Sequence, residues 1–124
     1  MGVIHKFKGK DGGFDWEGIS CETYVGDATK REVISQRDGA NNFAIRYFEV
    51  APGRHTSLDS HPHDHAVIVL RGKGAVLLGT EKHEINYGDA IYIPPHEIHQ
   101  FENNSDEPYG VHLRYSNQKM TADA

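Results

Sequence analysis

The sequence lacks the residues on which several classes of protein depend. It has a single cysteine, Cys21, so it cannot form an intramolecular disulfide or a site of several thiolates. Its longest apolar run, residues 66–70, is far shorter than the roughly 20 residues that span a bilayer. The first residues carry no apolar signal-peptide core. We therefore expect a cytoplasmic protein with no membrane partner.

Positive charge is also scarce. The chain has 13 Lys and Arg against 18 Asp and Glu, a net charge of -5, and its basic residues are scattered rather than gathered into a stripe. A surface that tracks phosphates needs such a stripe, so we expect no nucleic-acid partner. The sequence also offers no phosphate-cradling glycine loop, dinucleotide fingerprint or serine nucleophile elbow.

The distribution of apolar residues predicts an all-β fold. Helical periodicity is not sustained anywhere, whereas short runs rich in Val, Ile, Tyr and Phe are separated by Gly and Pro. The expected strands are residues 42–50, 66–70, 75–78, 90–93 and 111–115, and the Gly-rich segment 71–74 reads as a hairpin turn. This pattern is typical of an antiparallel sandwich or barrel.

The length of 124 residues predicts a single domain, residues 1–124. Residues 43–115 would form the barrel. Residues 1–40 alternate more weakly, and we expect them to supply edge strands or a dimer arm around Trp16.

Histidine is unusually abundant in this sequence. The chain has nine, and three of them alternate with Pro62 and Asp64 in the segment 61–65. Imidazole is a common metal ligand, so this composition alone predicts a metal site.

The spacing of these residues resembles the two motifs of the cupin family. The matching positions are Gly53, Asp59, His61, His65 and Gly72 in the first segment, and Gly88, Pro94, His96, His99 and Asn103 in the second. The resemblance implies a cupin-type antiparallel β-barrel, a jelly roll or double-stranded β-helix. It also implies one divalent transition metal held by Asp59, His61, His65 and His99, and a homodimer.

Three residues depart from the family pattern. Asp59 stands where the family has its first His and His65 where it has Glu, so the four positions still supply three imidazoles and one carboxylate. His96 replaces the second Gly of a Pro-x-Gly turn, where the backbone usually needs a positive φ.

The ligand set leaves one alternative open. Asp59 and His61 are two residues apart and would share one face of a strand. In the alternative, Asp59 accepts a hydrogen bond from a ligating His, and His63 is the substitute ligand. Imidazole with carboxylate suits Fe, Mn, Ni, Co, Cu or Zn, without selecting among them.

Such a site predicts a small metalloenzyme that acts on an oxygen-rich small molecule. A dioxygenase-type oxidoreductase is favoured, because a carboxylate ligand supports higher oxidation states. A sugar or sugar-phosphate isomerase or a lyase would use the same metal with a general base such as Tyr92, His63 or Glu97. The third option is a non-catalytic small-molecule-binding barrel.

The sequence also offers candidates for positions around the ligands. Arg46, Tyr92 and Phe101 are candidates to line the pocket, with core packing preferred for Phe101. On the strand 111–115, either His112 and Arg114 or Leu113 and Tyr115 would face inward, and the sequence does not decide. The remaining candidates for surface or turn positions are His55, His83 and His96.

Overall fold

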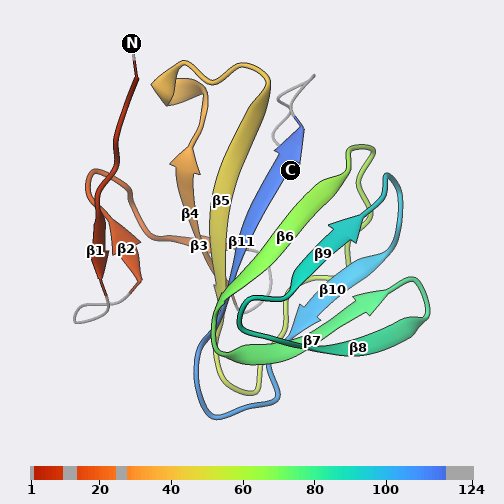
Figure 1. The fold of residues 1–124 in the computed structure, drawn as a ribbon. Helices are drawn as coiled ribbons and strands as arrows, with labels where there is room; N and C mark the ends of the chain where they lie inside the picture. The colour runs from red at the N-terminus through yellow and green to blue at the C-terminus, as the bar shows by residue number, and fades with distance from the viewer. Residues whose placement is uncertain (1, 10–13, 25–27, 117–124) are drawn as a thin grey trace.

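The computed structural model describes residues 2–9, 14–24 and 28–116, with the backbone only for residues 110–116. Its strands form a six-stranded sheet, a three-stranded sheet and a two-stranded hairpin, and every strand pair in them is antiparallel. In the described part of the chain the only helix is a 3-10 turn, Gln36–Asp38. The predicted all-β fold is thus confirmed (Figure 1).

The order of strands in the large sheet is β3-β4-β5-β11-β6-β9, and in the small sheet β10-β7-β8. The large sheet comprises β3 (Glu22–Tyr24), β4 (Ala28–Ile34), β5 (Phe43–Val50), β11 (Tyr109–Ser116), β6 (His65–Arg71) and β9 (Ala90–Ile93). The small sheet comprises β10 (His99–Glu102), β7 (Lys73–Leu78) and β8 (Glu81–Asn86), and the hairpin comprises β1 (Phe7–Gly9) and β2 (Asp15–Trp16). All five expected strands are present, and β8 and β10 are additional.

The core lies between the two sheets and follows from the two-residue period of a strand. On β6, His65, Val67 and Val69 are buried, whereas Ala66 and Ile68 between them are exposed. The inward side chains of both sheets meet in one cluster: Ala28, Ala44, Phe48, Val50, Val67, Val69, Val76, Ile85, Ile93, Phe101 and Tyr109. The same alternation brings His65 into the interior.

The Gly-rich segment between β6 and β7 is not the hairpin turn that the sequence predicted. β6 pairs with β11 and β9, whereas β7 pairs with β8 and β10, so the chain crosses here from the large sheet to the small one. Gly72 makes the crossing with a φ of 69°, and a Cβ atom there would collide with the Pro108 carbonyl oxygen. Glycines mark where the chain turns, but they do not reveal which sheet the next strand joins.

The hairpin of β1 and β2 packs on the outer face of β5 (Figure 1). The rings of Phe14 and Trp16 lie 5.0 and 5.3 Å from the ring of Tyr47. Arg31 of β4 donates a 2.8 Å hydrogen bond from Nε to Asp15. Trp16, which the sequence placed in an edge or a dimer arm, therefore packs against the chain's own large sheet.

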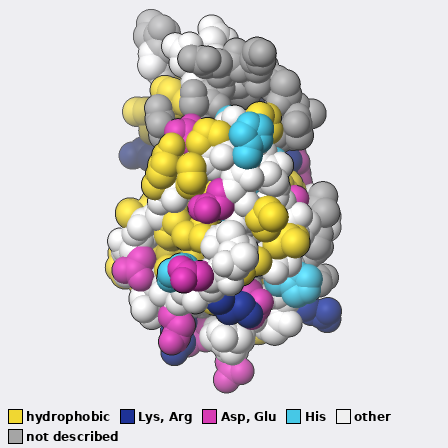
Figure 2. Space-filling model, turned by 90° about the vertical axis from the view of Figure 1, so that its right-hand side faces the viewer, with side chains coloured by type: hydrophobic (Ala, Val, Ile, Leu, Met, Phe, Trp, Pro, Cys, Tyr) yellow, Lys and Arg dark blue, Asp and Glu magenta, His cyan; other side chains and the backbone are white. Residues whose placement is uncertain are grey.

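The surface agrees with the composition. In the described part of the chain no helix is long and apolar enough to cross a membrane. The face shown in Figure 2 carries acidic and basic side chains close together, with hydrophobic ones between them.

Candidate metal centre

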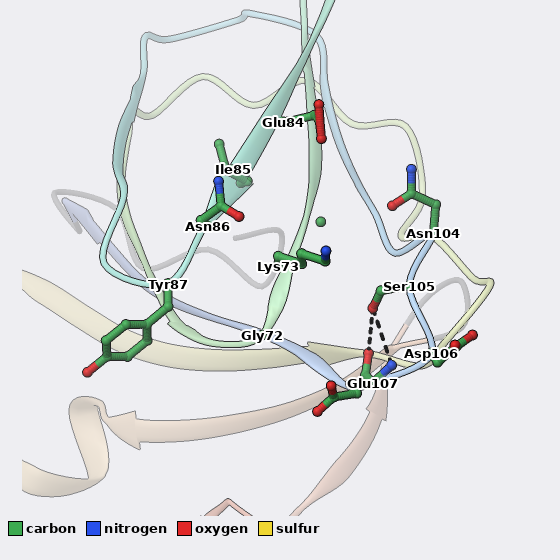
Figure 3. A pocket seen from close by; sticks show the side chains of 11 residues that line it. Gly72, Lys73, Glu84, Ile85, Asn86, Tyr87, Asn104, Ser105, Asp106 and Glu107 are labelled. Atoms are coloured by element: carbon green, nitrogen blue, oxygen red, sulfur yellow. Dashed lines mark hydrogen bonds between the residues drawn. The ribbon is translucent and has the colours of Figure 1, made fainter.

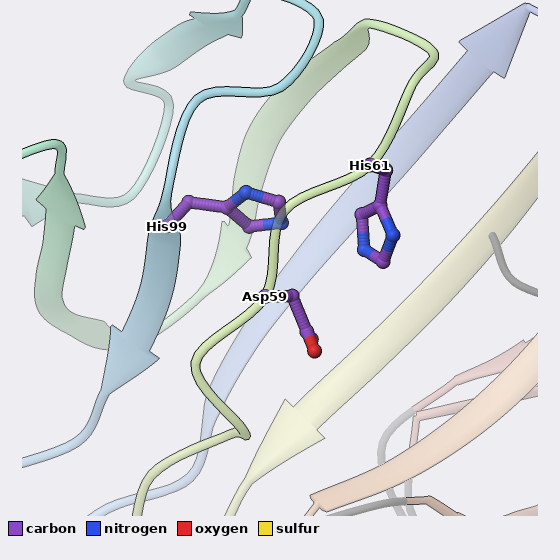
Figure 4. Close-up of side chains that lie close together, drawn as sticks. All are labelled: Asp59, His61 and His99. Carbon is purple, nitrogen blue, oxygen red and sulfur yellow. The ribbon is translucent and has the colours of Figure 1, made fainter.

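The predicted ligands meet at one end of the barrel. Asp59 and His61 lie on the loop between β5 and β6, while His99 is the first residue of β10. The side chains of these three residues point toward one another (Figure 4). One ligand atom from each lies within 4.8 Å of the others.

A short backbone bridge holds two of these ligands in register. The amide of Asp59 donates to the carbonyl of His99 at 2.9 Å, and the amide of His99 donates back to the carbonyl of Asp59 at 2.9 Å. Because His99 begins a strand of the small sheet and the Asp59 loop leads into β6 of the large sheet, the centre joins the two sheets.

Hydrogen bonds also orient the ligand side chains. The Nδ1 atom of His99 lies 3.0 Å from the carbonyl oxygen of Glu97, so Nδ1–H donates there and Nε2 keeps its lone pair. The hydroxyl of Ser57 donates to Oδ2 of Asp59 at 2.8 Å. Contacts of this kind fix the tautomer and direction of a metal ligand before the metal arrives.

His65, the first residue of β6, lines the same cavity but is not one of the three residues whose ligand atoms lie within 4.8 Å of one another. It is 3% exposed, and its ring lies 5.3 Å from that of His61 and 5.4 Å from that of His99. Burial, together with the positive charge of the neighbouring imidazoles and of Arg46, lowers the pKa of His65 to about 3. The ring is therefore neutral near pH 7, as metal binding requires.

His63, the substitute ligand that the sequence left open, belongs to the same cluster. Its ring stacks on that of His61 at 5.3 Å with an interplanar angle of 5°, and it lies 4.9 Å from that of His65. The cavity is nevertheless lined by Asp59 and not by His63. Asp59, and not His63, is one of the three residues whose ligand atoms lie within 4.8 Å of one another, together with His61 and His99.

His96 ties the turn before His99 to the ligand loop. It is the only non-glycine residue with a positive φ, 68°, among those described, and it stands where the family pattern has a glycine. Its amide donates to the carbonyl of His61, and its carbonyl accepts a 2.7 Å hydrogen bond from the hydroxyl of Ser60. The strained backbone therefore serves to couple the two ligand segments.

A cavity of about 30 Å³ lies among these ligands, which is room for an ion with a bound water. Beside Asp59, His61, His65 and His99 it is lined by Tyr24, Phe48, Thr56 and Phe101. The sequence analysis named Phe101 but missed the other three. Phe48 could have been predicted, since it is two residues from the candidate Arg46 and shares its face of β5. Tyr24 lies outside the span of the cupin motifs.

The candidate general bases are placed differently. Tyr92 is 60% exposed and donates from its hydroxyl to Asp64 at 2.9 Å. Glu97 presents its backbone carbonyl to His99, and neither residue lines the cavity. His55, His83 and His96 are exposed.

The question of which residues of the strand 111–115 face inward concerns side chains outside those described. The backbone register pairs Leu113 with Arg46 on one side and with Val67 on the other.

A second, larger hollow of about 680 Å³ lies at the other end of β6, beside Gly72 (Figure 3). It is lined by Gly72, Lys73, Gly74, Glu84, Ile85, Asn86, Tyr87, Asn104, Ser105, Asp106 and Glu107. Among the described residues, the group of His, Cys, Asp or Glu side chains close enough to share a metal ion is Asp59, His61 and His99, at the other site.

Fold and site together define a class: small antiparallel β-barrels with a His and carboxylate cluster at one end. Residues 46–112, more than half of the chain, match the family model described as a cupin domain. The chain belongs to the cupin family.

Individual proteins are also similar to this chain in sequence or in structure. A 1-methylthio-D-xylulose 5-phosphate methylsulfurylase from Rhodospirillum rubrum is 31% identical over 103 residues, or 78% of this chain and 65% of the relative. The chain thus spans slightly less than two thirds of that protein. A cupin 2 conserved barrel domain protein from Rhodopseudomonas palustris superposes with a TM-score of 0.81 at 25% identity, over 93% of this chain and 81% of that one. The polyketide cyclase RemF from Streptomyces resistomycificus gives 0.73 at 27% identity, over 80% and 74%.

Proposed function

We propose that the protein is a cupin metalloenzyme that acts on an oxygen-rich small molecule. Asp59, His61, His65 and His99 would hold one divalent transition metal, because three imidazoles and a carboxylate are a donor set that such ions prefer. The observation that carries the proposal is the convergence of ligand atoms from Asp59, His61 and His99 within 4.8 Å of one another.

The bound metal would supply Lewis-acid or redox chemistry. The residues of the chain itself orient the proposed metal ligands and shape the cavity. Ser57 holds the Asp59 carboxylate and the Glu97 carbonyl holds the His99 ring, while Phe48 and Phe101 give the cavity apolar walls that restrict water.

A dioxygenase is the reaction that we propose first. In a dioxygenation both atoms of O₂ enter the substrate, which itself supplies the electrons, so no separate reductant is needed. The carboxylate of Asp59 supports this choice because a negative ligand stabilises a more highly charged metal.

The methylsulfurylase relative favours a second candidate, a lyase or isomerase acting on a phosphorylated sugar derivative. The name of that relative specifies a sugar phosphate as its substrate, and the same ligands would serve an enediol reaction without O₂.

Metal content tests the proposal directly. Untagged protein purified without chelator should contain about one transition metal per chain by elemental analysis, and the Asp59→Ala and His99→Ala variants should lose it. The matched control is His83→Ala, an exposed histidine on β8, which should retain the metal. Wild-type protein that stays metal-free after reconstitution would overturn the metalloenzyme.

An oxygen electrode separates the two reaction classes. Metal-loaded protein should consume O₂ with a bidentate probe such as catechol if it is a dioxygenase. Conversion of a sugar phosphate with no O₂ uptake would instead support the lyase or isomerase.

The homodimer is a separate proposal. Exposed Ile68 on β6 and Tyr92 on β9 give the outer face of the large sheet an apolar character that suits a second copy. Sedimentation of the purified chain would show a dimer, and a purely monomeric species at micromolar concentration would contradict it.

A further inference from the structure

The hollow beside Gly72 lies between two walls (Figure 3). One wall is formed by the start of β7, the end of β8 and Tyr87, and β7 and β8 are paired strands of the small sheet. The other wall is the loop 104–107 between β10 and β11. The volume of about 680 Å³ falls within the range of roughly 300–1,000 Å³ in which proteins bind small molecules. The hollow is therefore large enough for an organic ligand.

The buried side chain of Asn103 holds the loop wall in one shape. It is 1% exposed, and its amide nitrogen donates 2.8 Å hydrogen bonds to the carbonyls of Val50 and Glu107. Its amide oxygen accepts hydrogen bonds from the backbone amide and the hydroxyl of Ser105, at 2.9 and 2.7 Å. The loop is thus preorganised, so a ligand would not have to order it on binding.

Two glycines let the loop and the sheet meet at the base of the hollow. A Cβ atom at Gly72 would collide with the carbonyl oxygen of Pro108, and one at Gly74 would lie 2.7 Å from the carbonyl oxygen of Glu102. Larger residues would push the loop and β10 away from β7. Gly72 and Asn103 are cupin-motif positions that supply no proposed metal ligand, and both shape this hollow.

The sheet wall presents charges of both signs on one face. Lys73 is the cross-strand partner of Asn86, and Glu84 is that of Ala75, which is two residues from Lys73. Side chains directly opposite one another, or two residues apart on a strand, point to the same side of a sheet. Lys73, Glu84 and Asn86 therefore project together. In Figure 3 the side chain of Lys73 stands between Asn86 and the loop residue Asn104.

The charges of the hollow are kept apart. Elsewhere on the small sheet the ammonium of Lys82 lies 3.1 Å from a carboxylate oxygen of Glu102. Among the ion pairs of the described residues, however, none joins Lys73 to a carboxylate of the hollow. These carboxylates are those of Glu84, Asp106 and Glu107. A molecule with opposite charges at its two ends would find a partner for each.

We propose that this hollow binds a short peptide with free termini. Lys73 would bind the terminal carboxylate, and the carboxylates of the hollow would bind the terminal ammonium, in charge-assisted hydrogen bonds. The side-chain amides of Asn86 and Asn104 match the donors and acceptors of peptide groups. The ring of Tyr87, which is 73% exposed, offers an apolar surface to a side chain of the ligand. This site goes beyond the proposed function, since none of the proposed metal ligands lines it.

Calorimetric titration of the metal-loaded protein with three matched probes tests the charge requirement. Trialanine carries both terminal charges, its N-acetyl form carries only the carboxylate, and its C-terminal amide carries only the ammonium. Trialanine should bind, and each capped form should bind roughly tenfold more weakly, because it lacks one charge-assisted contact. Equal binding of the three probes, or no binding of trialanine at about 10 mM, would overturn the proposal.

A lysine variant assigns the carboxylate end of the peptide. Lys73→Gln should weaken trialanine roughly tenfold and leave the affinity for the C-terminal amide unchanged, since that probe has no carboxylate to lose. The matched control is Lys82→Gln, whose ammonium is already paired with Glu102 on the same sheet, and it should change neither affinity. A Lys73 variant that weakens all three probes alike would show that the residue shapes the hollow and does not bind the carboxylate.

Acid variants assign the ammonium end. The double variant Glu84→Gln and Asp106→Asn should weaken trialanine roughly tenfold or more, and the N-acetyl form should bind as it does to the wild type. Glu81→Gln is the control, because Glu81 is an acid of β8 that lies outside the hollow and is 79% exposed. An unchanged affinity for trialanine in the double variant would overturn the proposal.

The Asp59→Ala variant keeps this site apart from the metal centre. It should bind trialanine as tightly as the wild type, since Asp59 lies in the other cavity. Binding that is lost in this variant would place the peptide at the metal centre, which would overturn the peptide site and leave the metalloenzyme standing. Binding that survives would support the peptide site even if the metalloenzyme fails.

Discussion

His96 illustrates how a single residue can carry strain at a functional site. Its φ of 68° lies in the left-handed region, which costs an ordinary residue about 1–2 kcal/mol. We expect His96→Gly to keep the free energy of unfolding within about 1 kcal/mol of wild type, because glycine accepts this backbone freely. His96→Val should lower it by about 1–2 kcal/mol, since a β-branched side chain tolerates the region least. Urea unfolding of the two variants measures both effects, and a more stable valine variant would contradict the account.

His65 makes the stability of the metal-free protein depend on pH. Burial is the main cause that lowers its folded pKa to about 3, whereas the unfolded imidazole titrates near about 6.5. Between these values the unfolded chain binds more protons, so the stabilisation is complete above about pH 6.5 and is lost as the pH falls toward 3.

The pH effect can be assigned to this one residue. In chelator-treated protein, urea unfolding should show a loss of up to about 3 kcal/mol between pH 7 and pH 4. The loss should be smaller in His65→Gln, whose side chain does not titrate. An equal loss in the wild type and the variant would show that other groups control acid unfolding.

Ligand spacing is a local property of the chain, so Asp59, His61, His65 and His99 stood out in the sequence by type and interval. Three of them, Asp59, His61 and His99, lie close together in the structure. Tyr24 and Thr56 carried no such signal, since a tyrosine or threonine is as common on any strand or loop.

At the level of elements, the hairpin of β1 and β2 acts as a cover for β5. Trp16→Ala should lower the free energy of unfolding by about 2 kcal/mol, because the half-buried indole packs on Tyr47. Metal content should not change, since Trp16 packs on the face of the sheet opposite the cavity. Thermal and urea unfolding measure the loss, and Tyr87→Ala, a highly exposed aromatic, is the matched control that should change stability by less than about 0.5 kcal/mol. An indistinguishable Trp16 variant would mean that the hairpin does not stabilise the sheet.

The strands that were predicted carry several apolar residues in a short run, whether burial alternates along them, as on β6, or not, as on β7. β10 alternates but has a single apolar residue, Phe101, and was missed. On β8 only Ile85 is buried, so the segment reads as polar loop. The charged residue Arg31 interrupts the apolar pattern of β4. Its side chain is buried, because it forms an ion pair with Asp15 and lies over the ring of Tyr47. That burial depends on a partner 16 residues away, which local periodicity does not detect.

At the scale of the whole molecule, the metal centre would act as a tie between the six-stranded and the three-stranded sheet. Removing the metal should lower the melting temperature, because an ion at 1,000 times its Kd stabilises the folded state by about 4 kcal/mol. Scanning calorimetry with and without chelator measures the shift. The His83→Ala variant should respond as the wild type does, and Asp59→Ala should not respond at all. A melting temperature that chelator leaves unchanged in metal-replete wild type would show that the ion does not tie the sheets.

The backbone bridge between Asp59 and His99 has a consequence for protein engineering. The turn at Gly79 and Thr80 separates β7 from β8, and a chain split there would leave Asp59, His61 and His65 on one fragment and His99 on the other. Neither half would own the full ligand set, yet strand pairing between β7 and β10 would bring the halves into register. Such a pair would reassemble more tightly in the presence of the ion, which makes this barrel a template for a split reporter whose output is metal concentration.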